Sequence, residues 1–362
     1  MLLGRTFGSY LGLRFLRTIG GVFLTVFVLV YTLDFVEQMR QAGDAENVGA
    51  AEVAFLSLLR TPAVAEQVLP FAVLFGGMIT LLGLSRKLEL VVARAAGVSA
   101  WQFLQPGIVV AAGIGILAVF VYNPLAAMLQ QEASARSAVL FARDADFASA
   151  RNVWIRQRSP DGTAIIRAEG VVEGTTRLAR PMILVFDREG RFVERIEARE
   201  GVLREGAWEL TDARVTALDV EPRLVPRYEL ASSLDPGQLR TSFTPPESVP
   251  FWRLDEIAEQ TELAGLDATS YRLQREALMA RPLLFVAMIL VAASVSLRFF
   301  RFGGVGQMVL GGVAAGFLLY VATELMEDLG GSGLVGTTLA AWFPAVVGSL
   351  LGVLVLLHKE DG

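Results

Sequence analysis

A run of charged and apolar side chains at residues 86 to 97, Arg-Lys-Leu-Glu-Leu-Val-Val-Ala-Arg-Ala-Ala-Gly, is the segment best suited to an ionic contact. Helical spacing gathers its apolar side chains on one face: Leu88, Val91, Val92, Ala95 and Ala96. The charged side chains lie off that face: Arg86, Lys87, Glu89 and Arg94. Gly97 is a typical helix stop. Such a helix either packs on lipid headgroups, which composition alone favours, or presents its charges to a protein partner.

Catalytic chemistry is restricted by the composition. The chain holds no cysteine and one histidine, His358, which excludes thiolate metal sites, multi-histidine metal sites and Ser-His-Asp catalysis. No G-x-x-x-x-G-K-[ST] sequence occurs, so the phosphate-binding loop of P-loop nucleotidases is missing. We therefore expect a chain that is not an enzyme by itself, with no metal, no cofactor and no nucleic-acid partner.

Ionisable side chains follow the first apolar segment, at Asp34, Glu37 and Arg40, beside Phe35. An ionised group at the bilayer centre costs about 2.5 to 3.5 kcal/mol on insertion scales, so such groups are usually functional or paired. Asp34, Glu37 and Arg40 lie near the predicted edge of the membrane, where the free-energy cost of an ionised group is lower. They are either solvated charges at a helix end or contacts with a substrate. In the second case Arg40 is the candidate for an anionic headgroup.

A later apolar segment contains Gly312-Val-Ala-Ala-Gly316, a pattern of small residues that allows helices to approach closely. These small residues either allow close packing between helices or form a contact along which a lateral gate opens and closes. Tyr320 and Glu324 follow it. They either line a cavity or, for the tyrosine, anchor the helix at the membrane interface.

The elements that position these residues are six apolar segments, each long enough to approach the roughly 20 residues that a membrane helix needs. The segments are Thr18 to Leu33, Gln67 to Ser85, Trp101 to Val121, Pro282 to Leu297, Phe302 to Thr323 and Val335 to Leu357. Ser99-Ala100-Trp101-Gln102 is a capping box for the third, and Asn123-Pro124 is its expected end. No acidic or basic residue lies centrally in these spans. The composition agrees with a membrane protein, since 53% of residues are hydrophobic and 19% charged.

Basic residues predict the orientation, because short cytoplasmic loops retain Lys and Arg. One side receives the basic residues Arg5, Arg14, Arg17, Arg86, Lys87, Arg94, Arg298, Arg301 and Lys359. The other side receives the acidic residues Asp44, Glu46, Glu52, Glu324, Glu327 and Asp328. We expect an inner-membrane protein with both termini in the cytoplasm and residues 123 to 281 outside it.

Between the third and fourth spans the apolar pattern alternates with a period of two, which is typical of antiparallel strands in a sandwich or jelly roll. Turn sequences separate the strands: Pro160-Asp161-Gly162, Glu189-Gly190, Glu200-Gly201 and Glu205-Gly206. The predicted fold is a six-helix, three-plus-three membrane domain with an inserted, periplasmic, all-β, jelly-roll-like domain. Its predicted parts are 1–125 with the surface helix 86–97, the β-domain 126–250, a helical connector 251–281 and the last three spans 282–362. Leu254, Ile257, Ala258 and Thr261 form the apolar stripe of the connector's first helix.

Four motifs together resemble the LptF/LptG permeases, the membrane subunits of the lipopolysaccharide exporter. The strongest is Ser85 to Ser99, which is similar to that family's coupling helix. The others are Phe35-Val-Glu-Gln-Met-Arg-Gln-Ala-Gly43, Trp154 with Asp161-Gly162, and Gly316-Phe-Leu-Leu-Tyr320. The resemblance extends over nearly the whole chain, and the Phe35 to Gly43 segment favours the LptG branch over LptF.

The resemblance implies a set of partners and roles. The partners are an LptB-like cytoplasmic ATPase dimer that binds ATP and Mg, an LptF-like second permease, a single-span LptC-like regulator, an LptA-like periplasmic bridge and lipopolysaccharide. Glu89, flanked by Arg86 and Arg94, would lie in a groove of the ATPase. The substrate path would include Asp34, Phe35, Glu37, Arg40, Tyr320, Glu324 and Trp154, with Gly312 and Gly316 at a lateral gate. An acid at Asp34, where family members can carry a basic residue, makes a phosphate contact there doubtful.

Three alternatives remain at this stage. One is the LptF half of the same complex. The second is a secondary transporter, which would need ionisable groups at the membrane midplane. The third is a membrane-anchored scaffold, which needs neither three spans on each side nor a cytoplasmic surface helix.

The orientation can be tested directly because the chain contains no cysteine. A single cysteine introduced at Gly97 is expected to react with a membrane-permeant maleimide and not with an impermeant one in intact cells. Labelling by the impermeant reagent before the membrane is opened would reverse the predicted orientation.

Overall fold

The computed structural model describes residues 5–42, 49–140, 153–159, 162–171, 176–187, 189–217, 221–232, 234, 245–263, 267–299 and 305–360. The described chain divides into two compact units. One is helical and draws on residues 1–133, 247–254 and 269–362, and the other is built mainly of strands and draws on 134–246 and 255–268.

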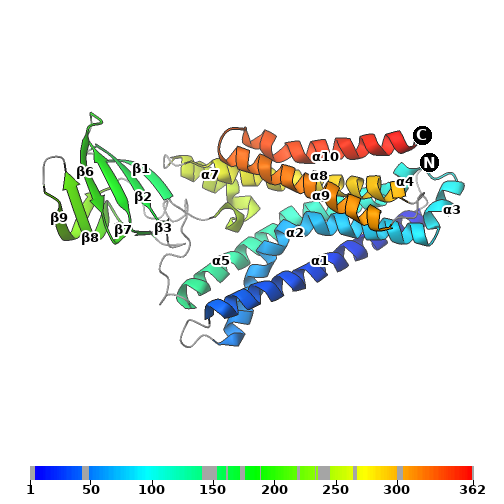
Figure 1. The fold of residues 1–362 in the computed structure, drawn as a ribbon, viewed down its shortest axis with the longest axis horizontal. Coiled ribbons are helices and arrows are strands. Elements are labelled where there is room, and N and C mark those ends of the chain that lie inside the picture. Colours follow the sequence, from blue (N-terminus) through cyan, green and yellow to red (C-terminus); the bar gives the residue numbers. More distant parts are fainter. Residues whose placement is uncertain are drawn as a thin grey trace. The chain divides into compact units, whose positions relative to one another are not determined.

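The helical unit contains six helices long and apolar enough to cross a membrane, which confirms the predicted number among the described residues. Its helices are α1 (Arg5–Ala42), α2 (Ala50–Arg86), α3 (Glu89–Ala95), α4 (Ala100–Leu117), the π-helix η1 (Ala118–Tyr122), α5 (Asn123–Leu140), α8 (Thr269–Phe299), α9 (Val305–Gly331) and α10 (Thr337–Glu360). The short 3₁₀ segments η2 (Pro246–Ser248) and η3 (Phe251–Arg253) and the helix α7 (Leu254–Leu263) precede α8. In Figure 1, α3 and the described chain ends lie at the same end of the bundle. The chain is a multi-pass membrane protein.

The membrane helices are longer than predicted, and the third does not end at Asn123-Pro124. It continues through η1 into α5 as one span, Ala100–Ser137. The backbone N–H of Asn123 bonds to the carbonyl of Ala118, five residues earlier. This wider π turn accommodates Pro124, which lacks an N–H and would clash with a carbonyl in a regular helix. The predicted capping box is confirmed: Ser99 Oγ accepts from the N–H of Gln102, whose side chain accepts from the N–H of Ser99.

Two helix seams depend on glycine. A Cβ at Gly115 in α4 would lie 2.5 Å from Cα of Pro282 in α8, and one at Gly76 in α2 would lie 2.6 Å from Cα of Ile19 in α1. Both neighbours are backbone atoms, which cannot rotate away. The apolar core between these seams contains Leu11, Phe15, Leu74, Phe103 and Phe285.

In the part of the strand unit that the structure describes, nine strands form one antiparallel sheet that closes almost on itself. Its strands are β1 (Val153–Ser159), β2 (Gly162–Ala168), β3 (Gly170–Val171), β4 (Arg177–Ala179), β5 (Met182–Phe186), β6 (Phe192–Glu197), β7 (Glu200–Arg204), β8 (Ala207–Ala217) and β9 (Arg223–Ala231). The order is β1-β2-β5-β6-β8-β7-β4-β3, with β9 paired to β8. The sheet agrees with the predicted jelly-roll-like class, and Figure 1 shows its strands curving around one interior.

Trp208 fills that interior and is fully buried. Its Nε1 donates to Oε1 of Gln157 in β1, at 3.1 Å, and Ser232 Oγ donates to the same oxygen at 2.8 Å. Gln157 Nε2 in turn donates to the carbonyl of Ala231 at the end of β9. One buried amide thus links β1 to the end of β9, two strands that do not pair in the sheet.

Two of the predicted turns are confirmed, and one is wrong. Gly190 joins β5 to β6 and Gly206 joins β7 to β8, both with a left-handed backbone. Glu200-Gly201 instead begins β7. Gly201 is needed there for close packing, because a Cβ would lie 3.0 Å from Leu210. Residues 207–217 form one long strand, β8, within which the backbone of Asp212 is left-handed.

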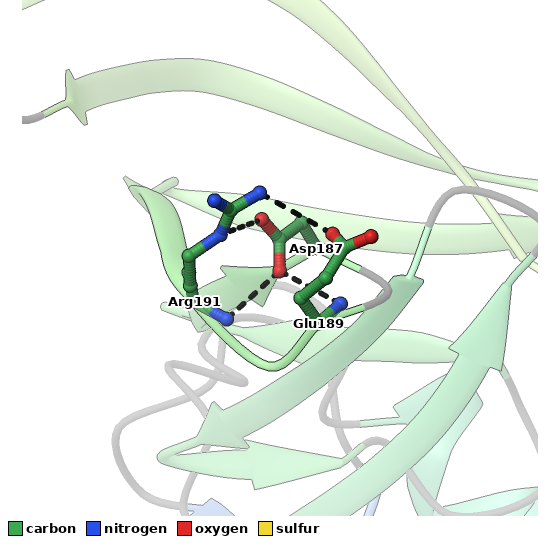
Figure 2. Close-up of polar contacts among 3 residues, drawn as sticks. All are labelled: Asp187, Glu189 and Arg191. Carbon is green, nitrogen blue, oxygen red and sulfur yellow. Dashed lines mark hydrogen bonds and ion pairs between the residues drawn. The ribbon is translucent and has the colours of Figure 1, made fainter.

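The β5–β6 turn is fastened by Asp187 (Figure 2). Its Oδ1 accepts from the backbone N–H groups of Arg191 and Glu189, and its Oδ2 accepts from Nε of Arg191. The backbone N–H of Arg191, followed by its guanidinium, lowers the pKa of Asp187 below the usual value. A lowered pKa means that this contribution to stability is present above the ordinary aspartate pKa and is lost as the pH falls below it.

Glycine substitutions test the α4–α8 seam. Gly115→Ala is expected to lower the free energy of unfolding by about 1 to 3 kcal/mol, because the new methyl group forces α4 and α8 apart. Gly113→Ala is the matched control, since a Cβ there meets nothing within 4 Å and alanine favours a helix. Thermal unfolding of the purified protein in detergent measures both. Equal unfolding midpoints for the two variants would show that Gly115 is not needed for the contact between α4 and α8.

Candidate functional site

The surface segment between α2 and α4 is shorter than the predicted helix. α3 starts at Glu89, after Leu88, whose φ of 59° is left-handed and outside the helix. Leu90, which lies off the predicted apolar face, is the residue that packs into the core and is 4% exposed. Gly97, with φ of 82°, follows the helix and agrees with the predicted stop.

The predicted apolar face of this segment is exposed. Leu88 is 58% exposed and Val92 is 67% exposed, and Val91 is exposed as well. Arg86 and Arg94 are also exposed, and neither forms a hydrogen bond or ion pair with other described residues. The outward surface of the segment therefore combines apolar side chains with cations.

Glu89 has partners within its own chain that the sequence analysis did not anticipate, and its predicted place in a groove of the ATPase stays a prediction. Nη1 of Arg14 in α1 donates to Oε1 of Glu89 at 3.0 Å and to Oε2 at 3.2 Å. The hydroxyl of Tyr10 donates to the same Oε2 at 3.2 Å. Glu89 therefore bonds within its own chain, to the first membrane helix.

The predicted substrate residues at the end of α1 are mostly paired. Nε of Arg60 in α2 lies 3.7 Å from Oδ1 of Asp34, an ion pair between the two helices. Oδ2 of Asp34 is buried without a hydrogen-bond partner among the described residues. Phe35 stacks on Tyr31, with ring centroids 6.3 Å apart.

Glu37 and Arg40 form an exposed ion pair one turn apart. Nε of Arg40 donates to Oε2 of Glu37 at 3.0 Å, and Nη2 donates to Oε1 at 2.6 Å. Gln41 donates to Oε1 as well. The guanidinium predicted to meet an anionic headgroup is thus already neutralised by a carboxylate of its own helix.

Tyr320 and Glu324 line a cavity of about 240 Å³ inside the helical unit. Its walls come from α2, α8, α9 and α10, with Glu247 of η2 at the edge. Besides the two predicted residues and Glu247, its polar lining residues are Glu66, Gln67, Gln274, Arg281, Thr323 and Glu327. The ring of Tyr320 lies 5.1 Å from that of Phe71. The role of Tyr320 and Glu324 in a substrate path stays a prediction.

A buried polar network forms one wall of this cavity and was missed by the sequence analysis. Arg281 of α8 forms an ion pair and hydrogen bond with Glu66 of α2, which is 6% exposed. Nδ2 of Asn123 donates to Glu66 at 3.1 Å, and Oδ1 of Asn123 accepts from the backbone N–H of Phe251 at 3.0 Å. The network therefore connects α2, α5, α8 and η3.

Glu66 and Arg281 each stand one residue outside a predicted span, at Gln67 and Pro282. The structure places both within the longer apolar helices Ala50–Arg86 and Thr269–Ser296, so these helices contain charged residues that the predicted bounds left out. Arg14 was visible in the sequence only as a basic residue at a helix end. No local pattern indicates these pairs, because Arg14 and Glu89 lie 75 residues apart and Glu66 and Arg281 lie 215 apart.

The remaining predicted residues lie elsewhere. Gly312 and Gly316 of α9 are buried against α2, where a Cβ would meet the side-chain ends of Met78 and Leu74. Trp154 pairs through its backbone with Arg167 of β2, and its side chain lies outside the described part of the structure.

Comparison with known proteins matches this architecture to one family. The profile described as lipopolysaccharide export system permease LptF/LptG matches residues 9–358. The chain belongs to the LptF/LptG family. It is similar to the lipopolysaccharide export system permease protein LptG of Escherichia coli K12, with 24% identity over 94% of this chain and 93% of that protein. It is also similar to LptG of Haemophilus influenzae, with 25% identity over 97% and 96% of the two chains.

Membership in the LptF/LptG family gives the described sites their context. The match extends over both membrane halves and the strand unit, so all three belong to one lipopolysaccharide export permease. The chain is a subunit of a transporter.

Removal of Glu66 tests the buried network. Glu66→Ala is expected to lower the free energy of unfolding by about 3 kcal/mol or more, because it leaves the Arg281 guanidinium buried without its counter-charge. Glu52→Ala, at the exposed start of the same helix, is the control and should cost less than about 1 kcal/mol. Thermal unfolding in detergent compares them, and a similar loss in both would show that the pair contributes nothing.

Proposed function

We propose that this chain is the LptG-like half of an ATP-driven exporter that extracts lipopolysaccharide from the inner membrane and passes it to a periplasmic bridge protein. A cytoplasmic ATPase dimer supplies the energy by binding ATP and Mg. A second, LptF-like permease completes the membrane part, and a single-span regulator joins it. Membership in the LptF/LptG family, with two LptG proteins among its relatives, supports this assignment.

The observation that carries the ATPase part of the proposal is the exposed surface of the segment from Arg86 to Gly97. Apolar side chains that stay exposed beside cations are typical of a protein docking surface. We place this surface against the ATPase: Val91 and Val92 would enter an apolar groove, and Arg86 and Arg94 would meet its acidic rim. Glu89 then acts inside this chain, through its ion pair with Arg14 of α1.

This arrangement requires an orientation. We place both termini and α3 in the cytoplasm, since Arg14, Arg86 and Arg94 gather there and short cytoplasmic loops retain basic residues. The strand unit then lies in the periplasm. The common location of α3 and the described chain ends at one end of the bundle supports this assignment (Figure 1).

The substrate path is proposed at the opposite end of the helices. There the Asp34–Arg60 pair has unused capacity for hydrogen bonds, since Oδ2 of Asp34 and Nε of Arg60 make none within the described chain. A polar lipid headgroup can supply the missing partners. Phe35, Glu37 and Arg40 continue this edge of α1, and Tyr320 and Glu324 line the neighbouring cavity. Trp154 remains a proposed contact for acyl chains in the strand unit.

Reconstitution tests the function as a whole. The complex of this chain with its ATPase and second permease, placed in vesicles with lipopolysaccharide, is expected to release that lipid to a soluble acceptor with ATP and not with a non-hydrolysable analogue. Release without nucleotide, or purification of this chain without any ATPase, would instead favour a secondary transporter or a scaffold.

A single charge tests the docking surface. Val92→Glu buries an acid in the proposed apolar contact and is expected to reduce co-purification of the ATPase by more than tenfold, since an unpaired charge at an interface costs more than the about 1.4 kcal/mol of a tenfold change. Leu224→Glu is the matched control, because Leu224 is also an apolar and exposed residue, in β9. Undiminished recovery of the ATPase with Val92→Glu would remove the proposed contact.

A further inference from the structure

Three side chains join α1 to the surface helix α3. The guanidinium of Arg14 contacts both carboxylate oxygens of Glu89, and the Tyr10 hydroxyl contacts one of them. Nη1 of Arg14 also donates to the Tyr10 hydroxyl at 3.0 Å, so the three groups form a closed triangle. Charge-assisted hydrogen bonds of this kind are directional and stronger than neutral ones.

The surroundings of Arg14 hold it in this position. A Cβ at Gly83 would lie 3.2 Å from Nη2 of Arg14, so the guanidinium lies against the last turns of α2 where glycine leaves room. Arg14 and Glu89 are both partly buried, with side chains 21% and 27% exposed. An ion pair shielded in this way is screened less by salt than a surface pair.

The middle of α1 is largely uncovered by the rest of the chain. Within its most apolar window only 6% of residues are buried, against 61% in α2. Its buried residues lie toward its two ends: Leu11, Phe15 and Ile19 in the half that carries Arg14, and Gln38 and Ala42 at the far end. No residue from 20 to 37 is fully buried, so a displacement applied near Arg14 meets little tight packing along the middle of the helix.

We propose that Arg14 is a positioning residue that passes displacements of α3 to α1. α3 is attached to the bundle in two ways: Leu90, with Ala93 beside it, packs on the apolar core, and Glu89 is bound by Arg14. When a partner moves α3, the apolar contact of Leu90 can slide, whereas the Arg14–Glu89 hydrogen bonds have fixed geometry and draw α1 along. This inference rests on the proposed function, in which the ATPase moves α3 and the far end of α1 borders the substrate path.

The test separates energy transfer from ATPase binding. In the reconstituted complex, Arg14→Ala is expected to leave ATPase co-purification and ATP hydrolysis in place while lowering lipid released per ATP by roughly fivefold or more, a typical size for coupling between sites. The charge swap, Arg14→Glu with Glu89→Arg, should recover part of this ratio, and Arg14→Lys should recover some as well. Arg17→Ala is the matched control: Arg17 is an exposed cation one turn along the same helix.

The outcomes distinguish this inference from the proposed function. An unchanged release ratio in Arg14→Ala would overturn the role of Arg14. So would equal loss of ATPase binding and transport without recovery in the charge swap, since Arg14 would then serve folding or docking alone. Failure of the unmodified complex to release lipid with ATP would count against the proposed function itself.

Discussion

Charged groups within a membrane bundle must find counter-charges on neighbouring helices, and this constraint organises the helical unit. Among the residues that the structure describes, three ion pairs between different helices meet it: Arg14 with Glu89, Asp34 with Arg60, and Glu66 with Arg281. In a medium of low dielectric constant an unpaired partner would be costly, so each pair restricts how its helices can be placed. The glycine seams at Gly76 and Gly115 set how closely the same helices approach.

The three pairs differ in what they leave available for function. Glu66 and Arg281 are satisfied by each other and by Asn123, which suits a fixed element of the bundle. Asp34 and Arg60 retain unused hydrogen-bonding atoms, which suits a site that meets a polar ligand. Arg14 and Glu89 connect a spanning helix to a short surface helix, which suits transmission of movement. The geometry of each pair therefore suits it to a different task.

The sequence predicts those features that depend on neighbouring residues. The number of spans, the capping box at Ser99, the turn at Gly190 and the jelly-roll-like class all follow from local patterns. Prediction from the sequence fails where the partner of a side chain lies far away along the chain. Glu89 was assigned to an outer surface because helical spacing alone cannot indicate Arg14, 75 residues earlier. The helix end predicted at Asn123-Pro124 was wrong for a different reason, since a π turn absorbs the proline.

That π turn has a consequence for how such chains can diverge. A π turn holds one residue more than α-helical geometry needs, so loss of a single residue from 118–122 would return this stretch to α-helical spacing and bring the ring of Pro124 against a carbonyl of the preceding turn. Every side chain beyond it would then rotate by about 100° around the axis, the angle of one residue in an α-helix. Asn123 would turn away from Glu66 and release Phe251. Insertions and deletions in this short stretch should therefore be selected against far more strongly than substitutions.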